Sequence, residues 1–86
     1  MKLSKFVTYD ANIGGLECRA GVGMGGQFVL LGDKLFTSLD NAQVYLIKEI
    51  DDRDGYSPAV RYRLTARLKW LEAVVIDLSQ IGMGKS

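Results

Sequence analysis

The amino-acid sequence predicts an α+β fold in which two helices pack on one face of a three- or four-stranded antiparallel sheet. Short apolar segments divided by glycine-containing turns occupy residues 2–36, and two helical patterns follow at 38–51 and 58–81. Strands first and helices afterwards are typical of an antiparallel sheet with its helices on one face. Because 86 residues with 48% apolar content suit one hydrophobic core, we expect a single domain over residues 1–86.

Four segments of the N-terminal part have strand patterns. The first is expected at residues 2–9, and it should end in a turn at 10–15, where aspartate, asparagine and two glycines cluster. Residues 16–22 alternate between apolar and polar or glycine positions, the period of a strand with one solvated face. Residues 27–31 are apolar on both faces and should lie centrally or under a helix. A tight reversal then leads to a short strand at 34–36.

The first helix is expected directly after these strands. Thr37 or Ser38 can cap its first free amides, and Asp40 lies favourably near its positive end. Asp51 and Asp52 oppose the negative end of a helix dipole, so the helix should end by about residue 51. The side chains expected on its buried face are Leu39, Ala42, Leu46 and Ile50.

The longest helical pattern, at residues 58–81, is the element around which the fold should be organised. Ser57 is a suitable N-cap, and Pro58, the only proline, suits the first helical position. Gly82 supplies a stop. The buried stripe of this helix is expected to comprise Leu64, Leu68, Leu71, Val75 and Leu78.

The second half of that helix is apolar on nearly every side, from Trp70 to Leu78. A helix with this pattern is usually buried all round. Two explanations are open: the sheet and the first helix cover different sides of it, or it meets another chain. Self-association as a homodimer would use Trp70, Val74, Ile76 and Ile81.

The sequence is poorly equipped for catalysis. It has no histidine, and therefore no His-paired nucleophile, imidazole metal ligand or ordinary acid–base group near neutral pH. Cys18 falls on the apolar side of its strand, where we expect a buried and unreactive thiol. Residues 21–26 match G-x-G-x-x-G, but they lead into a strand and not into a phosphate-binding helix, so a hairpin loop is expected. We predict a non-enzymatic protein with no cofactor and no metal site.

Charge and hydropathy favour a soluble protein of the cytoplasm. Lysine and arginine total 11 against 10 acids, and a net charge of +1 predicts neither a general nucleic-acid binder nor an acidic DNA mimic. No segment approaches about 18 consecutive apolar residues, and residues 1–5 lack the apolar run of a signal peptide. A single cysteine cannot form an internal disulfide, in agreement with a reducing compartment.

Two groups of residues are candidates for binding a partner. Basic and aromatic side chains surround the first half of the long helix, and arginine and tyrosine often dominate interface energies. This basic face comprises Arg61, Tyr62, Arg63, Arg67 and Lys69. The second choice is Tyr9 and Asp10, at the expected first turn. The alternative explanation of the arginines is a solvated helix face that only keeps the chain in solution.

The start of the first helix suggests one kind of partner. Residues 36–42, FTSLDNA, resemble the helix entry of integrase arm-binding and plant AP2-type domains, with an aromatic, a small hydroxyl residue and an alanine. That resemblance implies a three-stranded sheet that reads DNA through basic residues on its strands. Here the second strand offers Glu17 and Arg19 on its solvated face, and the third offers no cation, which departs from that pattern. DNA binding is the alternative function.

A second resemblance points to a protein partner. The opening MKLSKF at residues 1–6 and FTS at 36–38 are similar to segments of small phage anti-CRISPR proteins built from an antiparallel sheet and two helices. Such proteins inhibit a bacterial CRISPR surveillance complex by occupying its surface. The resemblance implies a host protein or ribonucleoprotein complex as the partner, in the cytoplasm of the host cell. A protein-binding inhibitor of this kind is the preferred functional hypothesis.

Overall fold

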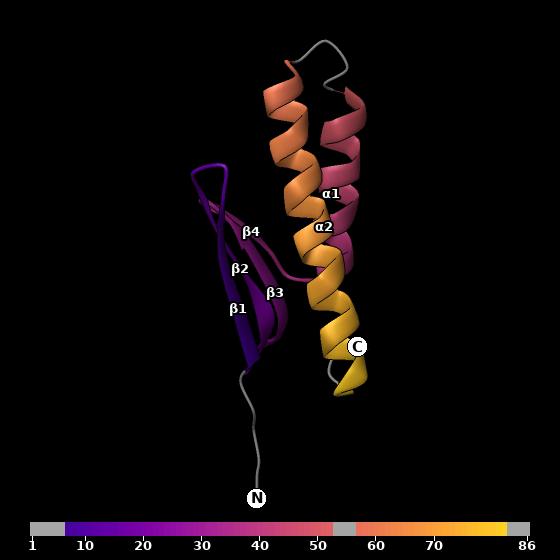
Figure 1. Cartoon of the computed structure of the whole chain (residues 1–86). Helices are drawn as coiled ribbons and strands as arrows, with labels where there is room; N and C mark the ends of the chain where they lie inside the picture. The colour runs from indigo at the N-terminus through magenta and orange to yellow at the C-terminus, as the bar shows by residue number, and fades with distance from the viewer. Residues whose placement is uncertain (1–6, 53–56, 83–86) are drawn as a thin grey trace, which may run out of the picture.

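A computed structural model describes residues 7–52 and 57–82, and it contains four strands followed by two helices (Figure 1). The strands are β1 (Val7–Ile13), β2 (Leu16–Gly23), β3 (Gly26–Leu31) and β4 (Lys34–Phe36), and the helices are α1 (Leu39–Asp52) and α2 (Pro58–Gln80). Neighbouring strands pair antiparallel in the order β1-β2-β3-β4. The predicted α+β fold, with both helices on one face of an antiparallel sheet, is confirmed (Figure 1).

The hairpins of the sheet turn at glycines. Ile13 pairs with Leu16, which leaves a loop of two residues between β1 and β2. Both of them, Gly14 and Gly15, have positive φ, at 64° and 84°. This is the type I′ geometry whose twist matches that of the flanking strands, and glycine adopts it without steric cost. The G-x-G-x-x-G segment at 21–26 joins β2 to β3 and is confirmed as a hairpin.

The first strand differs from the prediction. It does not end at residue 9 but continues to Ile13, and the turn lies at the two glycines that follow. Residues 2–6 of the predicted strand lie outside the described residues. Asp10 and Asn12 are exposed strand residues, because they alternate with the half-buried Tyr9 and Ala11 that face the helices. Their polarity marks the solvated face of β1 and not a turn.

Both helices begin at the predicted caps. The Ser38 hydroxyl oxygen accepts a hydrogen bond from the Asn41 amide at 2.9 Å, so Ser38 is the cap that α1 uses. The Ser57 hydroxyl oxygen accepts from the Val60 amide at 3.4 Å, with proline in the first turn of α2. Gly82 follows the end of α2 with φ of 79°, as expected of a glycine stop.

One core joins the two layers. Helix α2 packs on β1 and β2, α1 packs on β3 and β4, and the two helices pack on each other (Figure 1). The sheet and α1 bury Leu71, Val74 and Leu78 in the second half of α2, whereas Ile76 remains exposed, so the first of the two explanations accounts for part of its apolar surface. The buried apolar residues are Cys18, Ala20, Val29, Leu31, Leu39, Ala42, Leu46, Leu71, Val74 and Leu78. The predicted stripe residues Leu64, Leu68 and Val75 are half-buried against this core.

Candidate functional site

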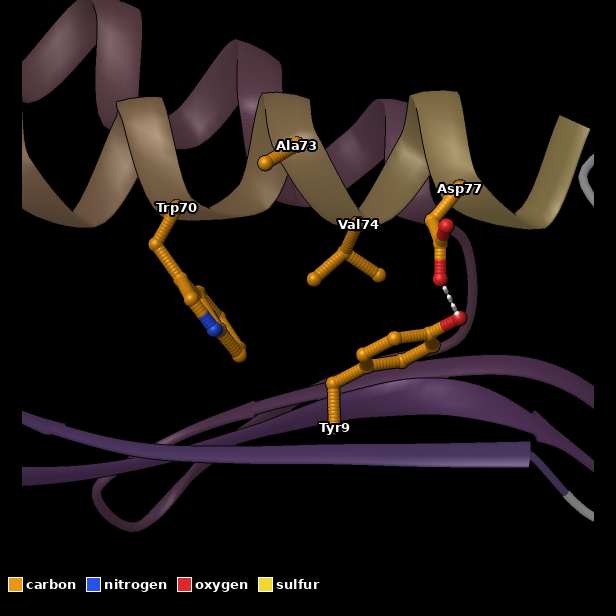
Figure 2. A pocket seen from close by; sticks show the side chains of 5 residues that line it. All are labelled: Tyr9, Trp70, Ala73, Val74 and Asp77. Carbon is orange, nitrogen blue, oxygen red and sulfur yellow. Dashed lines mark hydrogen bonds between the residues drawn. The ribbon is translucent and has the colours of Figure 1, made fainter.

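A groove lies between helix α2 and strand β1, at one edge of the sheet (Figure 2). It has a volume of about 310 Å³ and opens to solvent. Its lining residues are Tyr9 from β1 and Trp70, Ala73, Val74 and Asp77 from α2. We refer to it as the α2–β1 groove. Because this volume is at the lower end of the range for ligand sites, the groove suits a side chain of a partner better than a large ligand.

Regular spacing brings the lining residues together. Ala73, Val74 and Asp77 follow Trp70 by three, four and seven positions, so all four share one face of α2. Tyr9 points toward the same face, because alternate residues of β1 are directed at the helices. The rings of Trp70 and Tyr9 converge on the space below Val74 (Figure 2).

A hydrogen bond closes one end of the α2–β1 groove. The Tyr9 hydroxyl donates to Oδ2 of Asp77 (Figure 2). This hydrogen bond, with smaller contributions from desolvation and from the charge of Asp77, raises the pKa of the Tyr9 phenol above its ordinary value. The hydroxyl therefore keeps its proton at neutral pH. Among residues 7–52 and 57–82, Asp77 has no cationic partner.

The predicted basic face is only partly exposed. Tyr62, with 75% of its surface exposed, and Lys69 face solvent, whereas the three arginines are half-buried. The Arg67 guanidinium donates from Nε and Nη2 to the carbonyl oxygen of Ile13, at 3.1 and 3.0 Å. The three arginines are therefore less exposed than a fully solvated helix face would make them. Arg67 ties α2 to the end of β1.

Arg63 packs against the same turn. A Cβ added to Gly14 would lie 2.1 Å from Cδ and 2.6 Å from Cγ of Arg63, so the side chain lies directly on that glycine. Sequence reasoning missed this role because the two residues are far apart in the chain and glycine has no side chain to suggest a contact. A basic residue on a helix can serve packing through its apolar stem.

Tyr9 and Asp10, the second choice for binding a partner, lie on opposite faces of the sheet. Tyr9 lines the α2–β1 groove, whereas Asp10 lies on the uncovered face and forms an ion pair with Arg19 on β2, with Nε and Oδ1 2.6 Å apart. Neither residue is at a turn, which corrects their expected position. Because Asp10 engages Arg19, the strand cation that could contact DNA is already paired.

The four residues considered for self-association are also divided. Trp70 and Val74 line the groove, and Val74 is only 3% exposed because it packs on the core. Ile76 and Ile81 remain exposed at 59% and 55%. Val74 is therefore unsuitable as an interface residue, since the chain itself buries it. Asp77 and Ala73 were missed, although their helical spacing from Trp70 is readable in the sequence.

Few other side chains in the described part of the chain could react or bind a ligand. Cys18 is buried as predicted, and desolvation raises the pKa of its thiol, so the unreactive thiol form is favoured. Across residues 7–52 and 57–82, no group of histidine, cysteine or acidic side chains could hold a metal ion. Neither helix in these ranges combines the length and apolar character needed to cross a membrane.

Comparisons with protein-family models, curated proteins and solved structures find no match to this chain.

Proposed function

We propose that this chain is a non-enzymatic protein-binding module and that the α2–β1 groove is the centre of its contact surface. The observation that carries the proposal is the pair of half-buried aromatic side chains, Tyr9 and Trp70, that pack against the edge of the core and also line an open groove. Tryptophan and tyrosine are enriched among the residues that dominate binding energy. Such residues lie mostly in well-packed pockets near the centre of an interface.

The partner in this proposal is a bacterial host protein or ribonucleoprotein complex, which the chain would inhibit by covering part of its surface. The resemblance to phage anti-CRISPR proteins supports this specific version. The exposed Tyr62 and Lys69 would form the margin of the contact, since both lie on the same helix as the groove. Polar and mobile side chains at such a margin exclude water more than they add affinity.

The proposal can be tested by filling the groove without disturbing the core. Ala73 is exposed on the groove wall, and an Ala73→Gln variant should occupy part of the groove while keeping good helix propensity. The matched control is Ala59→Gln, at an exposed alanine of the same helix outside the groove. Both variants should unfold thermally within a few degrees of the wild type.

The assay is capture from a bacterial lysate on immobilised protein, with quantification by mass spectrometry. Proteins that bind through the groove should be retained by the wild type and by Ala59→Gln, and reduced about tenfold or more by Ala73→Gln. Equal capture by all three forms would show that the groove is not the contact surface. A gel shift with random duplex DNA at low and moderate salt should show no complex, and a salt-dependent shift would support the DNA-binding alternative instead.

A further inference from the structure

The sheet has two very different edges. Strand β4 has three residues, one of which is Lys34, whereas β1 has seven residues, no proline and no lysine. The one charged residue of β1, Asp10, is paired with Arg19 on the neighbouring strand. The pairing of β1 with β2 is uninterrupted from Val7 to Ile13, so no bulge twists this edge away. In the described part of the chain, no strand lies on the outer side of β1. Edges of this length are usually protected by charge, proline or a bulge, and an unprotected edge is a template for pairing.

The groove lies beside this edge. A strand added to β1 would place alternate side chains on the helix-facing side of the sheet, and the residue opposite Tyr9 would have its Cβ about 5 Å from that of Tyr9. Such a side chain would enter the space between Tyr9, Trp70 and Asp77. Main-chain pairing would then supply affinity, and the groove would supply selectivity, as in other cases of strand addition.

The groove has the chemistry to select a basic side chain. The faces of tryptophan and tyrosine attract cations, with tryptophan the stronger of the two. Asp77 adds a negative charge that has no cationic partner among residues 7–52 and 57–82. Ala73 and Val74 can contact the apolar stem of a lysine or arginine while its charged end reaches the carboxylate.

We infer that the partner presents an extended segment that pairs with the outer edge of β1 and inserts a lysine or arginine side chain into the α2–β1 groove. This inference rests on the proposed function and specifies its partner. A second copy of this chain pairing through β1 is a poorer occupant. Its own β1 segment, VTYDANI, contains no lysine or arginine that could enter the groove.

A short peptide serves as the probe. The acetylated and amidated pentapeptide Thr-Val-Lys-Val-Thr is compared with a peptide that has norleucine in place of lysine. Trp70 is the only tryptophan, so its fluorescence reports occupation of the groove directly. We expect saturable binding of the lysine peptide and about tenfold weaker binding of the norleucine peptide, since a solvent-exposed cation–π contact and one charge contact together amount to about this factor.

Two further measurements locate the contact. In Asp77→Asn, which can still accept a hydrogen bond from Tyr9, the preference for lysine should fall from about tenfold to about twofold. Amide hydrogen exchange should slow in β1 when the lysine peptide binds and stay unchanged in β4. Ala73→Lys should weaken binding of the lysine peptide, because its own ammonium group competes for the groove.

Equal affinity for the two peptides, or an unchanged lysine preference in Asp77→Asn, would overturn the inference about the cation. Slower exchange elsewhere than in β1 would overturn the inference about strand pairing. These failures are distinguishable from failure of the proposed function. Ala73→Gln could abolish capture from the lysate while the lysine and norleucine peptides bind equally. In that case the groove binds a protein, and only the inferred preference for a lysine or arginine side chain is wrong.

Discussion

Substitution of Gly14 by alanine tests the contact between the β1–β2 turn and helix α2. Gly14 and Gly15 both have positive φ, so alanine at either position should cost about 1–2 kcal/mol through the left-handed conformation alone. The two positions differ in their surroundings. The added Cβ meets Arg63 at Gly14, whereas at Gly15 it meets no atom within 4 Å. Gly14→Ala should therefore be the more destabilising variant.

The additional cost at Gly14 is the cost of displacing Arg63 from its rotamer, about 1 kcal/mol. In a domain of this size it corresponds to a further decrease of about 4–8 °C in the melting temperature relative to Gly15→Ala. In an Arg63→Ala background the long side chain is absent, and the difference between the two glycine variants should fall below about 0.5 kcal/mol.

The assay is thermal and urea unfolding of the two glycine variants, Arg63→Ala and the two double variants, followed by circular dichroism. A general change in stability from the Arg63→Ala substitution would affect both double variants equally and leave the difference between the two glycine positions unchanged. Equal destabilisation at Gly14 and Gly15 in the wild-type background would refute the packing of Arg63 on the turn. A difference that persists without the Arg63 side chain would refute it equally.

Three further predictions concern α2 and the groove. Because the folded pKa of Tyr9 is raised, the stabilisation from its hydrogen bond to Asp77 should be present below pH 10 and be lost as the pH rises through the folded pKa. The melting temperature of the wild type should therefore exceed that of Tyr9→Phe at pH 8, and the difference should vanish well above pH 10. In urea unfolding, Arg67→Glu should lower the free energy of unfolding by about 1–3 kcal/mol, because it leaves the Ile13 carbonyl without its charged donor. The control, Lys69→Glu at an exposed position, should change that free energy by less than about 0.5 kcal/mol. Light scattering over a range of concentrations should give the mass of a monomer throughout, and a mass that rises with concentration would support self-association.

The helices were the most predictable part of the fold because their signals are local. Ser38 and Ser57 are within three residues of the amides that they cap, and the buried residues recur at helical spacing. Both helix boundaries therefore agree with the prediction to within a residue at each end. The first strand was misplaced because Asp10 and Asn12 are common both in turns and on the solvated face of a strand. The alternation of residues 7–13 would have distinguished the two.

The candidate site was less predictable because half of it depends on contacts distant in sequence. Trp70 and Asp77 share a helical face that can be read from spacing, but Tyr9, which completes the groove, is 68 residues from the Asp77 that it contacts. The arginines were expected on an exposed face, for binding a partner or for solubility alone, because charge usually marks such a face. The structure instead places Arg63 and Arg67 on the first hairpin turn.

The sequence by itself determined the order of strands and helices, the caps of both helices, and much of the buried stripe of each helix. These follow from backbone preferences and from periodic burial, both of which act over a few residues. Only the tertiary structure decided that the backbone engages Arg67, that β1 forms an outer edge of the sheet within residues 7–52 and 57–82, and that an aromatic pair and a carboxylate line one groove. Those features arise where α2 crosses β1, and local preferences carry no information about which distant segments meet there.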